Sequence, residues 1–580
     1  MSPEDRIRNH LNFLYGPATG ERTFAALSQR LAEFRRRHPR SRVESPTAPT
    51  WFTERDVLLI TYGDQIAEPG RPPLQTLAEF LETHAPDALG GVHLLPYFPY
   101  SSDDGFSVID YRQVNPRLGD WTDVERLGKH FRLMFDAVIN HVSRESAWFQ
   151  AFLRGQEPYT DYFITCDPRA DLSAVVRPRT LPLLTAVETA HGLKHVWTTF
   201  SDDQIDLNYQ NPRVLLEIVD VLLLYVERGA TVIRLDAIAY LWKEIGTRCI
   251  HLPQTHRMVK LFRAVFDAVA PRVQLITETN VPHEDNIRYF GDGTDEAQMV
   301  YNFALPPLVL HTFRTGNARV LSQWAATLVP PSPTTTFFNF IASHDGIGVV
   351  PARGLLSERE IDALVDLTES QGGKVSYKTN SDGSRSPYEL NTTLFDALNS
   401  PGTSDASVSV RRFLASQAIM LSLAGVPGVY IHSLFGSRNW HEGVNQTGRA
   451  RTINRQKFQR ASLEAELAER HSLAHGIFHA YRDLLRVRRS HPAFHPNAPQ
   501  KLLTLADGVF GLVRTAPEGG ETVVALVNVT ARPQPVAVDL SAWGLPATNW
   551  RDLISGETFA ARNGQLRLET GGYQSLWLQA

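Results

Sequence analysis

The sequence predicts an α/β protein centred on a (β/α)8 TIM barrel, with an inserted subdomain after strand three, a long insertion after strand seven and a C-terminal antiparallel β domain. From residue 55 onward, short apolar runs rich in β-branched residues alternate with longer segments of helical period. About eight such units can be counted, which is enough to close a parallel barrel. After about residue 500 the hydrophobic period becomes two, which indicates antiparallel strands.

Length and composition are those of a folded globular protein. The 580 residues include 58 Lys and Arg against 62 Asp and Glu, a net charge of −4 that gives no general attraction to nucleic acid or anionic membrane. Two cysteines, Cys166 and Cys249, are too few for a disulfide framework. The polar N-terminus lacks a secretory apolar stretch, and no window approaches about 18 apolar residues. We therefore expect a cytoplasmic protein.

The chain begins with a predicted N-terminal helical extension over residues 1–50. The basic run at 35–40 fits the end of a helix, where cations offset the helix dipole, although it could also bind an anion or nucleic acid. Residues 44–50 have the composition of a linker.

Eight barrel strands are then predicted, and each is a short apolar run. They cover residues 57–62, 91–98, 131–141, 231–237, 273–280, 299–305, 337–345 and 426–433. The clearest helix lies before the fourth strand, with Asn211 placed to cap it, Pro212 in its first turn and Gly229 just beyond its end.

Five segments are expected from this pattern. They are the extension (1–50), the catalytic barrel (51–141 and 212–500), an inserted subdomain (142–211), an active-site loop insertion within the barrel (346–425) and the C-terminal β domain (501–580). Both insertions follow barrel strands, so we expect them to shape the pocket at the carboxyl end of the barrel.

Polar residues occur where the strands end. They are Asn140 and His141 after strand three, Arg234 and Asp236 at strand four, Glu278 at strand five, and His344 and Asp345 at strand seven. The carboxyl ends of barrel strands share one face, so three carboxylates should converge on one pocket. Burying like charges together is costly unless a site uses them.

Paired carboxylates suit a retaining glycosyl transfer, in which one attacks the anomeric carbon and the other protonates the leaving oxygen. Arg234, two residues before Asp236, would share its side of the strand and keep that carboxyl ionised. Asp236 is thus the candidate nucleophile and Glu278 the candidate acid/base, and Asp345 could hold sugar hydroxyls.

Structural explanations exist for each residue taken alone. Arg234 and Asp236 could form a structural ion pair, Glu278 could cap a helix, and His141 or His344 could be a core histidine. Histidines and carboxylates could also bind zinc or manganese, but no ligand cluster on adjacent strands is apparent. We expect no metal and no cofactor.

Four segments in order resemble the sequence blocks of glycoside hydrolase family 13, the α-amylase family. They are DAVINHVS (136–143), TVIRLDAIAY (231–240), ITETN (276–280) and FIASHDGIG (340–348). The resemblance implies that Asp236 is the nucleophile, Glu278 the acid/base and Asp345 a transition-state stabiliser. It also implies that His141, Arg234 and His344 surround the glucosyl ring. The calcium site common in α-amylases cannot be located in the sequence.

Within this family the chain is most similar to the sucrose phosphorylase group. The segment SSDDGFSVIDY implies that Asp103, together with Arg455, holds the outer hydroxyls of one terminal glucose, with Phe106 stacking nearby. The segment HVWTTFSDDQIDL (195–207) similarly implies glucose contacts for Phe200 and Gln204. A pocket closed behind one sugar fits removal of a single glucosyl unit.

The same resemblance implies a phosphate and acceptor site. Its residues would be Arg179, Tyr240 and Tyr388, whereas Glu389 stands where sucrose phosphorylases carry glutamine. The loop from Gly372 to Asn391 looks most like that of glucosylglycerate phosphorylases. Its cations Lys374, Lys378 and Arg385 would suit an anionic acceptor and phosphate, unless they belong to a solvated surface loop.

The implied reaction is reversible transfer of α-glucose between phosphate and D-glycerate through a covalent intermediate. Phosphorolysis of sucrose, sucrose 6′-phosphate or glucosylglycerol stays open, as do α-glucoside hydrolysis and a catalytically silent carbohydrate-binding role. The expected partners are small molecules: the α-glucoside, phosphate, glucose 1-phosphate and glycerate. We expect no nucleic acid or membrane partner, and a homodimer stays open.

Overall fold

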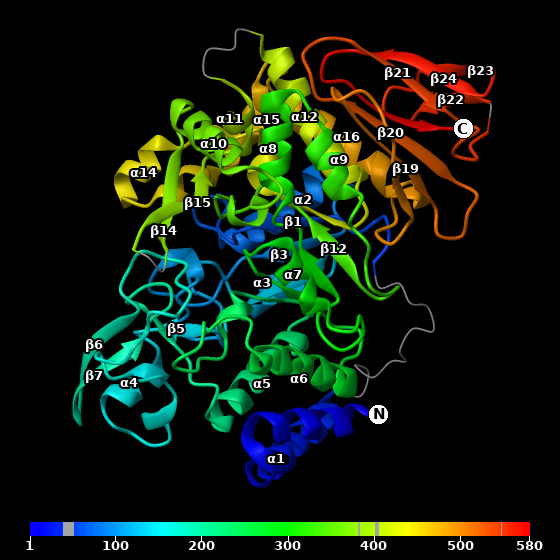
Figure 1. Cartoon of the computed structure of the whole chain (residues 1–580). Helices are drawn as coiled ribbons and strands as arrows, with labels where there is room; N and C mark the ends of the chain where they lie inside the picture. Colours follow the sequence, from blue (N-terminus) through cyan, green and yellow to red (C-terminus); the bar gives the residue numbers. More distant parts are fainter. Residues whose placement is uncertain (39–51, 381–382, 401–404, 547) are drawn as a thin grey trace.

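A closed barrel of eight parallel strands forms the centre of the computed structural model, which describes residues 1–38, 52–380, 383–400, 405–546 and 548–580 (Figure 1). Around the barrel the order is β1-β16-β12-β11-β10-β9-β4-β3. The strands are β1 (Leu58–Thr61), β3 (Gly91–Leu94), β4 (Arg132–Ala137), β9 (Ala230–Leu235), β10 (Gln274–Thr277), β11 (Met299–Tyr301), β12 (Thr336–Asn339) and β16 (Val426–Tyr430). Each overlaps one predicted segment, so the TIM-barrel prediction is confirmed.

Several predicted strands are too long at their carboxyl ends. Strand three was expected to run to His141, but β4 ends at Ala137. The strand-seven prediction ran to residue 345, whereas β12 ends at Asn339. The polar residues of these segments therefore lie beyond the barrel strands, where the backbone can aim them into a pocket.

Helices cover the outside of the barrel. They include α2 (Pro73–His84), α3 (Trp121–Leu127), α5 (Pro212–Glu227), α6 (Pro253–Val269), α7 (His283–Asn286), α8 (Leu305–Thr315), α9 (Arg319–Ala325), α13 (Ile431–Phe435), α15 (Arg460–Ala468) and α16 (Leu473–Arg489), whereas α14 (His441–Thr447) packs beside the short helix η7 (Ala450–Asn454). In α5 the Asn211 side chain accepts a hydrogen bond from the Arg213 amide, and Pro212 occupies the first turn. Gly229 follows the helix with a φ of +95°, a conformation that favours glycine.

The N-terminal helix α1 (Pro3–Arg37) packs against α6 and α5 (Figure 1). It bends at Gly16, and several of its arginines reach the barrel helices. Arg6 pairs with Asp267 at 2.6 Å, and Arg30 pairs with Asp220 at 3.1 Å. Residues 35–37 of the basic run form its last turn, as the sequence predicts, and the predicted linker at 44–50 lies outside the described residues.

Between β4 and α5 the chain leaves the barrel. This excursion contains β5 (His141–Ser143), α4 (Ala147–Leu153), β6 (Leu184–Thr189), β7 (Gly192–Trp197) and β8 (Gln204–Asp206). Strands β5 and β8 pair antiparallel, with His141 opposite Asp206. The buried Lys243 ammonium lies 2.6 Å from Asp206 Oδ2 and donates to Asn140 Oδ1 at 2.6 Å. This lysine thus joins the excursion to the barrel.

The chain between β12 and β16 forms a small sheet and two longer helices. The sheet has the order β13-β15-β14, from β13 (Ile347–Gly348), β14 (Lys374–Thr379) and β15 (Arg385–Asn391). The helices are α10 (Glu358–Ser370) and α12 (Ala406–Ser422), with the short α11 (Leu394–Leu398) between them. Helix α12 packs against α16 and α8, so the end of this segment belongs to the helical shell of the barrel.

The C-terminal part is an eight-stranded antiparallel sheet, as the change of hydrophobic period predicts. Its strands are β18 (Gln500–Leu502), β19 (Val509–Thr515), β20 (Thr522–Asn528), β21 (Gln534–Asp539), β22 (Asn549–Asp552), β23 (Thr558–Arg562), β24 (Gln565–Thr570) and β25 (Ser575–Gln579). One side carries a separate apolar core that includes Trp550.

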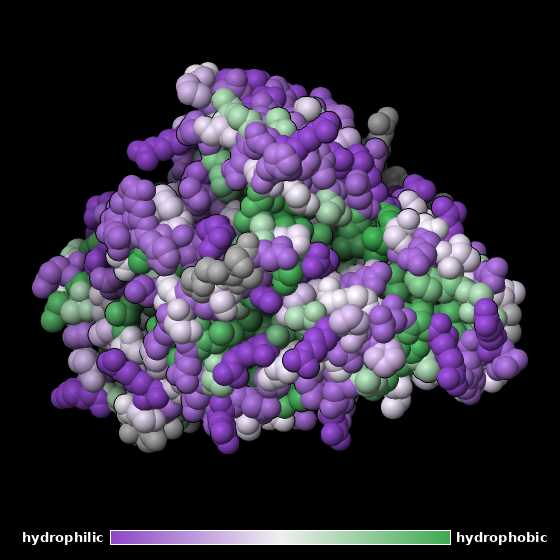
Figure 2. Space-filling view, turned by 90° about the horizontal axis from the view of Figure 1, so that it is seen from above, coloured by the Kyte–Doolittle hydropathy of each residue, from purple (hydrophilic) through white to green (hydrophobic). Residues whose placement is uncertain are grey.

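Hydrophilic residues cover most of the face in Figure 2, and green apolar residues show mainly in the hollows between them. Within the described ranges, no helix is both long and apolar enough to cross a membrane.

Candidate active site

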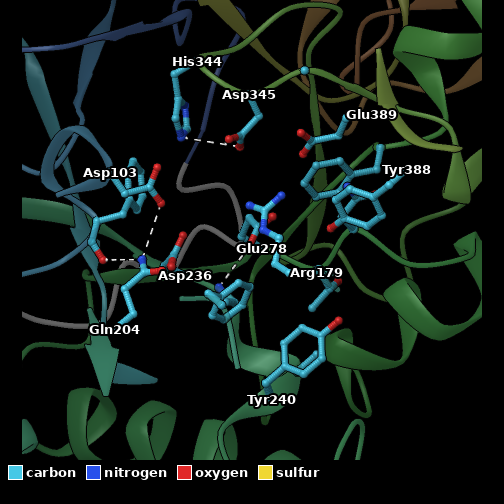
Figure 3. Close-up of a pocket in the computed structure, with 18 of the residues that line it drawn as sticks. Asp103, Arg179, Gln204, Asp236, Tyr240, Glu278, His344, Asp345, Tyr388 and Glu389 are labelled. Atoms are coloured by element: carbon cyan, nitrogen blue, oxygen red, sulfur yellow. Dashed lines mark hydrogen bonds and ion pairs between the residues drawn. The ribbon is translucent and has the colours of Figure 1, made fainter. Parts of the chain in front are cut away.

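A pocket opens at the carboxyl end of the barrel strands, and most predicted site residues line it (Figure 3). The structure brings together Asp103, Phe106, His141, Arg179, Phe200, Gln204, Arg234, Asp236, Tyr240, Glu278, His344, Asp345, Tyr388 and Glu389. Figure 3 shows Asp236 and Glu278 near its centre, with Asp103 and Gln204 on one side and Tyr388 and Glu389 on the other. Four predicted residues do not line this pocket: Arg455, Lys374, Lys378 and Arg385.

The two central carboxyls are unequally placed around Arg234. This arginine is the penultimate residue of β9 and donates to Asp236 Oδ1 at 2.7 Å, whereas its closest approach to Glu278 Oε2 is 4.0 Å. After Asp236 the chain turns sharply, because Ala237 has a φ of +47°. The turn lets the Ala237 amide donate to Glu278 Oε2 at 2.9 Å. The turn at Ala237 therefore sets the positions of the Asp236 and Glu278 carboxyl groups relative to each other.

Burial raises the pKa of Asp236, and the neighbouring Glu278 carboxylate raises it further. Burial also raises the pKa of Glu278. Two like charges this close are costly in a buried site, so the pair favours holding one proton. The shorter distance from Arg234 favours the negative charge on Asp236 and the proton on Glu278.

A further carboxylate, besides Asp236, contacts Arg234. Asp136, on β4, is fully buried, contacts the Arg234 guanidinium and lies 2.6 Å from His93 Nε2. Burial alone would raise the pKa of Asp136, but Arg234 and His93 hold it below its usual value. The prediction did not include Asp136 and His93. Asp136 could have been identified from the sequence, because it is the first residue of the family-like block at 136–143.

The wall expected to hold glucose contains two buried histidines and a buried phenylalanine. The Phe106 and His344 rings stack with centroids 5.0 Å apart, and burial lowers the pKa of His344 to about 3. His141 Nε2 lies 2.9 Å from the Phe106 carbonyl oxygen, to which Gln204 Nε2 also donates at 3.0 Å. Burial keeps both histidines uncharged by lowering their pKa, and the contacts fix the orientation of the rings.

Arg455 lies behind this wall. It was expected to act with Asp103, but it pairs with Asp104 at 2.5 Å and donates to the His344 carbonyl at 2.8 Å. Asp103 and Asp104 both have positive φ, 54° and 51°, and this tight turn points the two side chains to different partners. Asp103 faces the pocket instead, where Gln204 Nε2 lies 3.4 Å from its Oδ2.

Arg451 lines the pocket and was absent from the prediction. Its Nε and Nη2 donate to the two carboxylate oxygens of Glu389 at 3.0 and 2.5 Å, and its Nη1 lies 2.6 Å from Asp345 Oδ1. Against the effect of burial, Arg451, His344 and Arg455 hold the pKa of Asp345 far below its usual value. The clue was the repeated arginine in RTINRQ, at positions 451 and 455.

The predicted loop lysines lie elsewhere. Lys374 and Arg385 are exposed, and Lys378 lines a separate cavity with Arg177 and Arg248. The hairpin explains this, since Tyr388 and Glu389 on β15 reach the pocket, whereas Arg385 pairs with Thr379 at the far end. Arg179 lies in the pocket, with its guanidinium carbon 5.8 Å from the centre of the Tyr388 ring.

No group of three or more His, Cys, Asp or Glu side chains within the described residues is arranged to hold a metal ion. Asp236 and Glu278 line one pocket as a pair of neighbouring carboxyl groups. Such a pair performs displacement at an anomeric carbon with carboxyl groups alone.

Comparisons with known proteins agree with this architecture. Residues 88–345 match the family model of the α-amylase catalytic domain, and residues 504–577 match the C-terminal domain of maltogenic amylases. The chain is 53% identical to the glucosylglycerate phosphorylase of Allomeiothermus silvanus over 100% of this chain and 99% of that protein. It is 44% identical to the glucosylglycerate phosphorylase of Escherichia coli, over 99% of this chain and 100% of that one.

A solved structure of a related enzyme has the same fold. The sucrose 6F-phosphate phosphorylase from Thermoanaerobacter thermosaccharolyticum superimposes with a TM-score of 0.71 at 27% identity, covering 82% of this chain and 94% of that one. Identity to the two relatives extends over almost the whole length, and the barrel with its carboxylate pocket matches the family architecture. The chain therefore belongs to glycoside hydrolase family 13, the α-amylase family.

Proposed function

We propose that the protein is a retaining phosphorylase that transfers one α-glucosyl unit between phosphate and D-glycerate. Full-length relatives named glucosylglycerate phosphorylase at 53% and 44% identity support the reaction. The observation that carries the mechanism is the unequal placement of two carboxyls around one guanidinium, 2.7 Å for Asp236 and 4.0 Å for Glu278. It provides an ionised nucleophile beside a protonated acid, as a retaining transfer requires.

In the first step, Asp236 attacks the anomeric carbon of glucosylglycerate as the bond to the glycerate oxygen breaks. Glu278 gives its proton to that oxygen, so glycerate leaves with a neutral hydroxyl group and with its carboxylate unchanged. The product is a β-glucosyl ester of Asp236. Arg234 contacts the nucleophile before attack, and Asp345 stabilises the positive charge that develops on the sugar ring.

In the second step, a phosphate oxygen attacks the same carbon from the vacated side. Glu278, now ionised, accepts the phosphate proton where one is present, and Asp236 is released as carboxylate. Two inversions give α-glucose 1-phosphate with net retention. Arg179, Tyr240 and Tyr388 line the side of the pocket where phosphate or glycerate would bind.

The remaining lining residues hold the glucose. Asp103, His141 and His344 present polar atoms to the sugar, and Phe106, Phe200 and Gln204 complete the wall. Arg455 acts from behind by fixing the His344 backbone, with its Nε 2.8 Å from the carbonyl oxygen. Glu389 acts on the acceptor side through Arg451. We also infer a cytoplasmic location, which the two free, buried cysteines support.

The test supplies glucose 1-phosphate with glycerate, fructose, fructose 6-phosphate or glycerol in separate reactions, and measures phosphate release and the glucoside formed. We expect glycerate to give the highest kcat/KM. Preference for fructose or fructose 6-phosphate would assign the chain to sucrose-type phosphorolysis. Release of glucose at the same rate with and without each acceptor would make the protein a hydrolase.

A further inference from the structure

A second cavity of about 280 Å³ adjoins the catalytic pocket, and we name it the arginine vestibule. It is lined by Ser102, Asp103, Arg179, Leu181, Phe200, Ser201, Gln204, Ser376, Arg449, Ala450, Arg451 and Arg455. Five of these residues also line the catalytic pocket: Asp103, Arg179, Phe200, Gln204 and Arg451. The two cavities are therefore neighbouring compartments with a common wall.

The charge of the vestibule is opposite to that of the whole chain. Four arginines face one carboxylate, Asp103, although the chain carries a net charge of −4. Two of the arginines, 451 and 455, are paired with carboxylates outside the vestibule. Within the described part of the chain, no carboxylate lies within ion-pair distance of the other two, Arg179 and Arg449.

Arg451 keeps donors available at the common wall. A guanidinium has five N–H groups. Its three contacts with Glu389 and Asp345 use one N–H each, which leaves two for a ligand. Guanidinium groups with spare N–H donors are well suited to carboxylate and phosphate oxygens. The vestibule thus has the chemistry of a site for small oxyanions.

Arg449 is the outermost of the four. It is exposed, lies outside the catalytic pocket and precedes the short helix η7 (Ala450–Asn454), which carries Arg451. An exposed cation at the entrance of a cleft raises the local concentration of anions, and salt screens this effect over about 10 Å at 0.1 M. Arg449 can therefore attract an anion without contacting the reacting atoms.

Resting on the proposed function, we propose that the arginine vestibule captures small oxyanions, the carboxylate of the acceptor or inorganic phosphate, before they reach the glucosyl enzyme. Arg449 makes the outer electrostatic contact, and Arg179 and Arg451 receive the anion at the common wall. The vestibule thereby favours anionic acceptors over neutral acceptors of similar size.

The experiment uses α-glucosyl fluoride, a neutral donor, so that only the acceptor carries charge. Glycerate, phosphate and glycerol are varied separately at low and high salt, and glucosides, glucose 1-phosphate and free glucose are measured. For Arg449→Gln we expect kcat/KM for the anions, relative to that for glycerol, to fall about 3- to 10-fold at low salt, as loss of steering predicts. The difference should vanish at high salt, and Arg449→Lys should restore the preference.

The matched control is Arg272→Gln, which removes an exposed arginine just before β10, at the amino end of the barrel. A fall for glycerate alone, or for phosphate alone, would support the proposal and identify the captured anion. An unchanged anion preference in Arg449→Gln, or an equal fall for glycerol, would overturn it. If the wild-type protein formed neither glucosylglycerate nor glucose 1-phosphate, the proposed function itself would fail, which is a distinct result.

Discussion

The two sides of the catalytic pocket are built differently. The side that we propose holds the donor is built mainly from residues on barrel strands or in the loops after them, with Phe200 and Gln204 added from the excursion after β4, and its buried charges are paired, as in Asp136 with Arg234. The side that we propose holds the acceptor combines Tyr240, which follows β9, with residues from the excursion, the β14–β15 hairpin and η7. There Arg179 lies against an aromatic ring rather than a carboxylate.

This difference separates chemistry from specificity. Hydrogen bonds between the barrel strands hold the strand ends in place. The carboxyl groups of Asp236 and Glu278, which directly follow two of these strands, therefore keep the fixed geometry that catalysis needs. Loops tolerate changes of sequence and length, so the acceptor site can change without disturbing the reacting atoms. Substitutions on the donor side should therefore affect all acceptors equally, and those on the acceptor side should change the preference among them.

The largest effect is expected for Asp236→Asn. Loss of the covalent nucleophile should lower kcat for every acceptor by at least about 10⁴-fold, comparable with removal of the nucleophile in other covalent enzymes. Transfer from glucose 1-phosphate is measured alongside the apparent Tm, which should stay close to the wild-type value. Near-normal turnover in a folded variant would remove Asp236 from its role.

A smaller loss is expected for Glu278→Gln, about 10²- to 10⁴-fold in kcat, the usual contribution of general acid–base catalysis. Fluoride leaves without protonation, so α-glucosyl fluoride should form the glucosyl enzyme much faster than glucosylglycerate does. Burst kinetics of fluoride release check this. Equal impairment with both donors would show that Glu278 does not protonate the leaving group.

Arg451→Gln tests the arginine that pairs with both Asp345 and Glu389. Arg451 holds the pKa of Asp345 low, so its loss should raise that pKa, and the acid-side decline of kcat/KM should move to higher pH. Glucosyl fluoride hydrolysis measured across pH reports this shift. In the double variant Arg451→Gln/Glu389→Gln, the buried Glu389 charge is also removed, yet the displaced pH profile should remain. An unmoved acid limb would contradict the pairing.

The smallest effect on turnover is expected for Lys243→Met, which leaves the carboxyl pair untouched. Removal of one partner from a buried pair should destabilise the fold by about 3–5 kcal/mol, because Asp206 is left as an unpaired buried charge. Thermal unfolding measures the loss, and Lys243→Met/Asp206→Asn should recover part of it. A variant as stable as the wild type would show that this contact does not hold the excursion in place.

Much of the donor side could be predicted from the sequence. Closure of a parallel barrel brings all carboxyl strand ends to one face, so the positions of Asp236, Glu278 and Asp345 followed from the strand pattern alone. The strand pattern did not predict that Arg455 pairs with Asp104. Its choice of Asp104 depends on two consecutive residues with positive φ, and no hydrophobic period records such a turn.

The acceptor side was harder to predict. Lys374, Lys378 and Arg385 were placed in the site because they neighbour Tyr388 in sequence, but the direction of a hairpin depends on tertiary packing. Arg451 lies on a short helix of five residues, which is too short to show a period. Charge density along the chain therefore pointed to the hairpin, but it did not show that Tyr388 and Glu389, rather than the cations, line the pocket.

The pairing of β5 with β8 has a consequence for protein engineering. Ser143 and Gln204 are register partners, so the long excursion between them starts and returns at adjacent points. The entropy of closing a loop rises only slowly with its length. The segment between these two residues, which carries Arg179 and Phe200, could therefore be replaced by its counterpart from another phosphorylase, provided that its contacts with Arg248 and Cys249 are kept.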